Sequence, residues 1–288
     1  MFYYDFEIAG LLLRVRSEFA LREFHELSYY RVEHRPQRHP DAQYTIQALP
    51  EDWEICGLRI LEDRQNAIYQ WQGEEHRYYF WNIFSQERFI LLRYRLDDPH
   101  DYTIYLQAED LTRILPQFRL SALFSPERLL LHHSAFQLHA SVISWNGNGI
   151  LFTAPSGTGK STQADLWKRL EGAQILNGDR AIIRNENDKF RVYGSPYAGS
   201  SGIYTNHSVP IRAIVALSQA SENSLRPLTA VAAFNQLYRE STVRYWDPEF
   251  VDVFSNLLLS LIERVPIYHL ACRPDAGAVA ILKAELSK

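Results

Sequence analysis

A glycine-rich segment near the middle of the chain carries residue types that bind phosphate groups. Residues 154–161 read Ala-Pro-Ser-Gly-Thr-Gly-Lys-Ser, between an apolar run at 150–153 and an amphipathic stretch at 161–170. A loop between a strand and a helix is the setting that a phosphate-binding loop requires. Glycines let successive backbone N–H groups turn toward one anion, and the start of the helix adds a positive partial charge.

The loop predicts a role for individual residues. Lys160 is expected to hold the β and γ phosphates of a nucleoside triphosphate, and the Ser161 hydroxyl is expected to ligate Mg²⁺. Ala154 stands where the GxxxxGK[ST] pattern has glycine, and because alanine is the smallest replacement we expect the loop to keep its conformation. The alternative is a plain glycine-rich turn with an exposed lysine. Such a turn seldom has both a strand before it and a helix after it. The other predicted nucleotide-binding residues are Ser156, Gly157, Thr158, Gly159 and Thr162.

Two further residues could act on a hydroxyl that receives a phosphoryl group. Such a transfer needs a group that accepts the hydroxyl proton. Asp179 follows the predicted strand 174–177, which places a carboxylate beside the loop, but Asn177-Gly178-Asp179 is also a turn sequence. His139 lies on the strand that leads into the loop strand, although a single histidine is more often a satisfied core or surface residue.

The elements that must position these residues are predicted from periodicity and caps. Strand 138–145, a tight turn at 146–149 and strand 150–153 precede the loop, and helix 161–170 ends at Gly172. Capped helices are predicted at 229–241, 247–263 and 275–286. Further strands are expected at 174–177, 181–184, 190–193, 211–217 and 265–271. This half of the chain is therefore predicted to be α/β with a mixed sheet.

The N-terminal half has a different pattern. Residues 6–16 alternate around Gly10 like a hairpin, and turn residues separate the later apolar–polar runs. We predict a mostly antiparallel β-rich domain at 1–110 that helps to hold the substrate, a helical connector at 111–136 and the loop-bearing domain at 137–288. The further strands predicted for the N-terminal domain are 43–49, 67–72, 77–83, 88–94 and 102–107.

Composition argues against several classes of protein. The net charge is −4 with acids and bases interspersed, which argues against binding to nucleic-acid backbone. No run of about 18 apolar residues occurs, so we expect no membrane span, and the N-terminus lacks the charge order of a signal peptide. Cys56 and Cys272 lie far apart and outside metal or redox motifs. We therefore expect a cytoplasmic protein, and leave open whether it forms a homo-oligomer.

These motifs together resemble the catalytic domain of the HPr kinase/phosphorylase family of serine kinases, which is related to ATP-type phosphoenolpyruvate carboxykinase. The matching residues are Leu138-His139-Ala140-Ser141, the Asn-Gly turn, the SGTGKS loop and Asp179-Arg180. Segments 194–200, 209–217 and 267–270 look like members that phosphorylate a serine of a lasso-peptide precursor. The resemblance implies a hairpin before the loop, and ATP and Mg²⁺ as cofactors.

The resemblance also implies a role for each site residue. Asp179 would be the base on the hydroxyl and a ligand of Mg²⁺ with Ser161, Lys160 would hold the phosphates, and His139 would support the site. Bifunctional HPr enzymes carry two adjacent aspartates where this chain has Gly178-Asp179, so we expect only the forward reaction.

The leading hypothesis is a kinase that transfers the γ-phosphoryl group of ATP to a serine or threonine of a peptide or small protein. One alternative is a small-molecule kinase or a carboxykinase-like enzyme, although the latter should show an extra set of metal-binding residues. A second alternative is a nucleotide-dependent regulatory or binding protein that hydrolyses ATP slowly. Transfer to an added peptide would favour the kinase, and hydrolysis without an acceptor would favour the regulatory protein.

Overall fold

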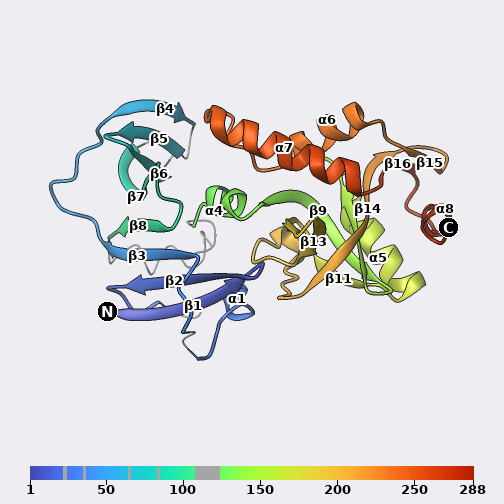
Figure 1. Cartoon of the computed structure of the whole chain (residues 1–288), viewed down its shortest axis with the longest axis horizontal. Coiled ribbons are helices and arrows are strands. Elements are labelled where there is room, and N and C mark those ends of the chain that lie inside the picture. The colour runs from blue at the N-terminus through green and yellow to red at the C-terminus, as the bar shows by residue number, and fades with distance from the viewer. Residues whose placement is uncertain (22–24, 35–36, 64–65, 83–84, 108–123) are drawn as a thin grey trace. The chain divides into compact units, whose positions relative to one another are not determined.

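The structure is a computed structural model that describes all residues except 22–24, 35–36, 64–65, 83–84 and 108–123. The described chain divides into two compact units, Met1–Leu129 and Leu130–Lys288 (Figure 1). Residues 111–123, half of the predicted helical connector, lie outside the described residues, and the domain limits at 110 and 136 stay predictions. The last two residues of the predicted connector, 135 and 136, belong to strand β9 (Ala135–Trp145) and not to a helix. Within the described part of the connector, helix α4 spans Glu127–His132 and begins directly after Ser125-Pro126.

The first unit contains one mixed sheet with the strand order β1-β2-β3-β8-β7-β6-β5-β4. The predicted hairpin and the five further strands are present within a few residues of their expected limits, except that residue 83 lies outside the described chain. Strand β4 was not predicted, because its side chains are mostly exposed or half-buried without alternation. The strands are β1 (Phe2–Ile8), β2 (Leu11–Ser17), β3 (Ala42–Ala48), β4 (Leu58–Glu62), β5 (Asn66–Trp71), β6 (Glu74–Asn82), β7 (Ser85–Arg95) and β8 (Asp101–Leu106).

The expectation of a mostly antiparallel sheet holds for five of the seven strand pairings described in this sheet, and two pairings differ. Strand β3 pairs in parallel with both β2 and β8, whereas the other neighbours in the described sheet are antiparallel. Two parallel neighbouring strands need a crossover connection, which brings the chain back to the end of the sheet where the first strand began. Helix α1 (His25–Ser28) lies in one such connection, and strands β4 to β7 make up the other.

The second unit also contains a mixed sheet, and its strands partly close on themselves. The pairings run β10–β9–β12–β13–β14, and β14 pairs again with β10. Strand β9 makes this closure possible, since residues 135–139 pair with β12 and residues 140–145 pair with β10. The strands are β9 (Ala135–Trp145), β10 (Asn148–Thr153), β11 (Gln174–Asn177), β12 (Arg180–Glu186), β13 (Lys189–Tyr193), β14 (Ser208–Gln219), β15 (Ser224–Pro227) and β16 (Ile267–Cys272).

Helices cover both faces of this sheet. Helices α5 (Lys160–Glu171) and α8 (Ala276–Leu286) share one apolar cluster with β10 and β14, and α6 (Ala230–Glu240) and α7 (Pro248–Arg264) share another with β9 and β12. The predicted caps are confirmed: side chains at the starts of α6, α7 and α8 accept hydrogen bonds from the third residue beyond, and α5 ends at Gly172. The four-residue β15 and a short 3₁₀ helix at Gly199–Ser201 were not foreseen in this half. The prediction of an α/β fold with a mixed sheet is confirmed.

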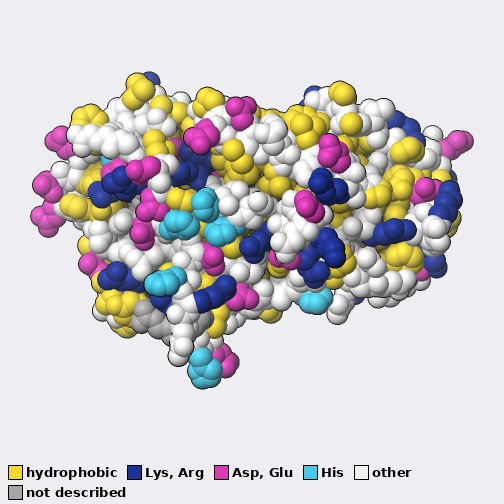
Figure 2. Space-filling view, in the orientation of Figure 1, with side chains coloured by type: hydrophobic (Ala, Val, Ile, Leu, Met, Phe, Trp, Pro, Cys, Tyr) yellow, Lys and Arg dark blue, Asp and Glu magenta, His cyan; other side chains and the backbone are white. Residues whose placement is uncertain are grey.

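The surface carries charges of both signs. On the face shown in Figure 2, Lys and Arg side chains lie among Asp and Glu side chains rather than in one continuous basic area. Among the described helices, none is both long enough and apolar enough to cross a lipid bilayer.

Candidate active site

The glycine-rich loop connects β10 to α5, as predicted. Gly157 and Gly159 have φ angles of 79° and 120°, and an added Cβ at either would meet no atom of the described chain within 4 Å. The backbone conformation, and not lack of space, is therefore what requires glycine here. Ala154 is fully buried and does not have a positive φ, so alanine fits at this position.

The loop leaves backbone donors open at the start of α5. Gly159 occupies the N-cap position, and no side chain caps the helix. The first N–H groups of a helix have no partner within the helix, and together with its dipole they favour an anion. Lys160 is the first residue of α5 and is 7% exposed. Its Nζ donates to the carbonyl oxygens of Ala154 (2.7 Å) and Pro155 (3.3 Å).

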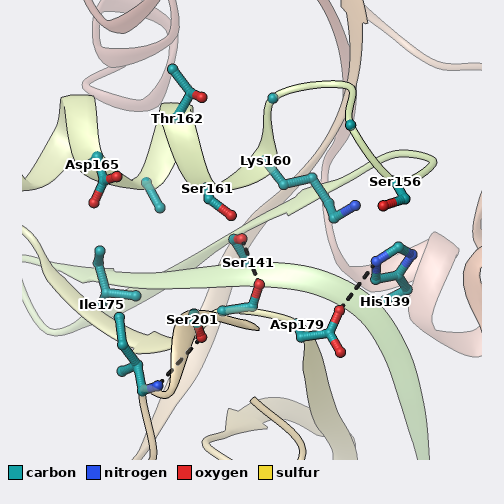
Figure 3. A pocket seen from close by; sticks show the side chains of 15 residues that line it. His139, Ser141, Ser156, Lys160, Ser161, Thr162, Asp165, Ile175, Asp179 and Ser201 are labelled. Carbon is teal, nitrogen blue, oxygen red and sulfur yellow. Dashed lines mark hydrogen bonds and ion pairs between the residues drawn. The ribbon is translucent and has the colours of Figure 1, made fainter. Parts of the chain in front are cut away.

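A pocket of about 530 Å³ opens beside the loop. Its walls come from the loop, the first turns of α5, strand β9, the turn after β11 and the 201–203 segment. Figure 3 shows Lys160 and Asp179 extending toward the same space from opposite sides. The residues that carry its chemistry are His139, Ser141, Lys160, Ser161, Asp165 and Asp179.

Asp179 is held in place through its backbone. Its N–H donates to Asn177 Oδ1 (2.9 Å), and its carbonyl accepts from the N–H of Ala140 on β9 (2.8 Å). Asn177 is fully buried, and its amide donates to the carbonyl of Ser195 (3.2 Å). The Asn-Gly-Asp sequence is thus a turn, as the alternative interpretation had it, and the turn also presents its carboxylate to the pocket.

His139 lies between two carboxylates. Its Nε2 is 3.3 Å from Asp179 Oδ1, and its Nδ1 is 2.9 Å from Glu240 Oε2 at the end of α6. The hydrogen bond from His139 lowers the pKa of Asp179, and the positive charges of Arg180 and Lys160 lower it further against the effect of burial. Burial lowers the pKa of Lys160, and the Glu240 and Asp179 carboxylates oppose that change. The Lys160 ammonium and the Asp179 and Glu240 carboxylates therefore act on one another's charge.

The pocket offers oxygen atoms of the kind that Mg²⁺ prefers. Ser161 and Asp179 line it, as does Asp165, which lies one helical turn after Ser161. Mg²⁺ is commonly held by one or two carboxylates with water and substrate phosphates rather than by a full set of protein ligands. The described residues contain no group of three His, Cys, Asp or Glu side chains arranged as a metal site. A Mg²⁺ ion that shares phosphate ligands fits these residues.

The structure brings most of the predicted site residues to this one pocket: His139, Ser156, Gly157, Gly159, Lys160, Ser161, Thr162 and Asp179. Thr158 does not line it and faces a second pocket on the other flank of the loop. Asp165 and Glu240 were not among the residues predicted from the sequence. The i, i+4 spacing from Ser161 could have revealed Asp165, but Glu240 lies 101 residues from His139 and has no local signal.

Comparisons with known proteins give one structural similarity and one family. The structure resembles that of the Hpr(Ser) kinase/phosphatase from Coxiella burnetii, with 12% sequence identity and a TM-score of 0.31, over 52% of this chain and 97% of that chain. A similarity at this level does not establish an activity. A search of curated proteins found no match. Residues 108–275, more than half of the chain, match the family model of the SynChlorMet cassette protein ScmC, and the chain belongs to this family.

Proposed function

We propose that this protein is an ATP-dependent kinase that transfers the γ-phosphoryl group to a serine or threonine hydroxyl of a peptide or small protein. The observation that supports this proposal is the position of the Asp179–His139–Glu240 row, which lies across one pocket from Lys160. An anion-binding loop alone would suit any nucleotide-binding protein. A carboxylate with an ordered partner, facing that loop, suits transfer to a hydroxyl.

The loop would bind and orient the triphosphate. Backbone N–H groups at 157–161 and the Lys160 ammonium would neutralise the β and γ phosphates, as positioning and charge neutralisation dominate phosphoryl transfer. Mg²⁺, held by Ser161 and Asp179 together with the phosphates, would neutralise the charge that develops on the leaving group.

Asp179 would receive the proton of the acceptor. An ordinary aspartate is already ionised at neutral pH, and the pKa of Asp179 is lower still, so its carboxylate carries no proton and can accept one. The acceptor oxygen forms a bond to the γ phosphorus while its proton passes to Asp179, the bond from that phosphorus to the β,γ-bridging oxygen breaks, and ADP leaves. His139, hydrogen-bonded to Asp179, would keep the carboxylate pointed at the hydroxyl.

Transfer to a library of serine- and threonine-containing peptides, measured with γ-labelled ATP, tests this proposal. We expect Asp179→Asn to lower transfer by 10²-fold or more, on the order of a general base's contribution, with a much smaller loss of ATP affinity by calorimetry, because Ser161 and the phosphates still hold Mg²⁺. Lys160→Ala should weaken ATP binding itself. Asp165→Asn serves as the matched variant, because it removes a second carboxylate from the same pocket.

Four outcomes would contradict parts of the proposal. Equal loss of ATP binding and transfer in Asp179→Asn would remove its role as the base. Loss of transfer in Asp165→Asn with a fully active Asp179→Asn would move that role to Asp165. Labelled phosphate released to water with no labelled peptide would favour a regulatory nucleotide hydrolase, and labelling of small alcohols alone would favour a small-molecule kinase.

A further inference from the structure

The glycine-rich loop has a second pocket on its opposite flank. This pocket has a volume of about 430 Å³ and shares Gly157, Gly159 and Thr162 with the first. Its other walls include the carboxyl ends of β14 and β16 with the residues that follow them, at 217–220 and 272–274. The loop therefore borders two different cavities, of which only the first contains His139 and Asp179.

The order of the strands explains why the two pockets lie on different sides. Strand β10, which leads into the loop, pairs with antiparallel β9 on one side and with parallel β14 on the other, and β14 pairs in parallel with β16. The carboxyl ends of β10, β14 and β16 therefore meet at one edge, which is where ligands bind in sheets of this kind. The first pocket belongs to the β9 side and the second to the β14 side.

We propose that the second pocket binds the base and ribose of the nucleotide, while the first pocket receives the acceptor. This inference rests on the proposed kinase function. In phosphoryl transfer the acceptor oxygen and the leaving oxygen lie on opposite sides of the transferred group. Since Asp179 marks the acceptor side, the nucleoside must extend from the loop toward the other flank, where the second pocket lies.

The second pocket has groups that suit an aminopurine. Gln163 lines it and is 2% exposed; its Nε2 lies 3.4 Å from Cys272 Sγ, and its Oε1 has no hydrogen-bond partner within the described structure. A buried amide oxygen without a partner is costly to the fold. Adenine has a hydrogen-bond donor next to an acceptor on one edge. It can therefore donate to an amide oxygen or accept from an amide nitrogen, whichever of the two atoms of the Gln163 side chain lacks a partner.

The exposed rim of this pocket supplies a stacking surface. Arg273 follows β16; its side chain is 60% exposed, and its Nε lies 3.0 Å from Asp275 Oδ2. A guanidinium plane stacks well on a purine ring. Ala220 lies on the opposite segment, is exposed, and joins the two walls through a hydrogen bond from its N–H to the carbonyl of Cys272 (3.2 Å). A large side chain at Ala220 would fill the space that the base needs.

Calorimetry with two probes, Mg·ATP and Mg·tripolyphosphate, tests the inference on the full chain. Wild-type protein should bind ATP at least about tenfold more tightly than tripolyphosphate, because only ATP has a base to bury. Ala220→Trp should remove that advantage and leave tripolyphosphate affinity within about twofold. Ala284→Trp, at an exposed position on α8, is the matched control and should bind both probes as the wild type does.

A second variant separates binding from folding. Gln163→Leu keeps a similar volume and removes an amide whose oxygen has no partner in the described chain. Its nitrogen makes one long hydrogen bond, to Cys272 Sγ, so the melting temperature should change little. The variant should weaken ATP binding by about three- to tenfold and leave tripolyphosphate unaffected.

The outcomes distinguish the two proposals. If wild-type protein binds neither probe, the phosphate loop is wrong and both proposals fall. If tripolyphosphate binds while ATP has no advantage, or if ATP affinity survives Ala220→Trp unchanged, only the nucleoside site is overturned. If Ala220→Trp keeps ATP affinity but loses transfer to peptides, the second pocket is the acceptor site instead.

Discussion

Glu240 is a residue whose importance follows entirely from its contact with His139. Both ring nitrogens of His139 face carboxylate oxygens, so that both hydrogen bonds form together only when each nitrogen carries a proton. A ring held in this way by two partners cannot rotate freely, and neither can the Asp179 carboxylate that it contacts. Glu240 therefore acts on the reaction through His139 and is a positioning residue.

We predict that Glu240→Gln lowers the rate of phosphoryl transfer by on the order of tenfold, less than the loss of the base itself. The amide keeps the shape of the side chain but removes the charge that faces the imidazole. ATP affinity at neutral pH should change little, whereas the acidic limb of the pH–rate profile should move. Glu263→Gln, an exposed glutamate near the end of α7, is the control. An unaltered pH profile would contradict the positioning role.

Gly178 is required for a steric reason. A Cβ at this position would lie 2.1 Å from Ser201 Oγ and 2.4 Å from Ser201 Cβ, and Gly178 does not have a positive φ. The segment that contains Ser201 therefore packs directly against the turn that presents Asp179. An aspartate at 178, as in the bifunctional HPr enzymes, would not fit without moving that segment.

We predict that Gly178→Ala lowers the free energy of unfolding by about 1–3 kcal/mol, the usual cost of overpacking. Ser201→Gly loses the hydrogen bond from its Oγ to the Ala198 carbonyl and should be mildly destabilising by itself. The double variant should recover most of the loss caused by Gly178→Ala. Urea denaturation of all four proteins measures the coupling, and strictly additive effects would show that the contact does not limit residue 178.

At the scale of elements, the loop works because a hairpin strand and a helix hold its two ends. Strand β9 fixes β10 from one side, and the Oγ1 of Thr153 donates to the carbonyl of His139 across this pair (3.0 Å). Helix α5 is anchored by Trp167, which is fully buried and packs edge-on against Trp145. With both ends fixed, the conformation between them depends on its glycines.

We predict that Gly159→Ala weakens tripolyphosphate and ATP binding by about tenfold or more, because its φ of 120° would cost alanine about 1–3 kcal/mol. The reverse exchange at the loop entrance is the control. Ala154→Gly restores the residue of the usual pattern but should not improve binding, since Ala154 already has an ordinary backbone conformation. Calorimetry of both variants checks this, and tighter binding by Ala154→Gly would contradict our account of the loop.

At the scale of the whole molecule, the charged set in the pocket links folding to pH. Asp179 has a lower pKa in the folded chain than an ordinary aspartate, mainly through its hydrogen bond with His139. A group of this kind binds fewer protons in the folded state than in the unfolded state over the intervening pH range. Its contribution to stability is thus fully present above the unfolded pKa of about 4 and is lost as the pH falls through the folded pKa.

We predict that Asp179→Asn is less stable than the wild type at pH 7 and that the difference shrinks steadily as the pH falls below about 4. Other groups titrate in both proteins, so the difference isolates Asp179. Urea denaturation at a series of pH values between 7 and 3 measures it. A difference that stays constant over this range would show that the ion pair with His139 does not form in solution.

Much of the fold is encoded in local signals. The limits of α6, α7 and α8 were predictable because their cap residues satisfy donors within the same turn, and the 154–161 loop was predictable because its glycines meet a local backbone requirement. The strands were also found, since alternation reports burial on one face. Strand β4, with little burial, gave no such signal.

The sequence by itself therefore determined the phosphate-type loop, the helices that follow it and the nomination of His139, Lys160 and Asp179. Only the tertiary structure decided which strands pair, that Glu240 completes the row with His139, that Ser201 excludes a side chain at 178, and that a second pocket lies beyond the loop. These features join residues far apart in the chain. They depend on how strands and helices pack against one another, and no local pattern of residues records that packing.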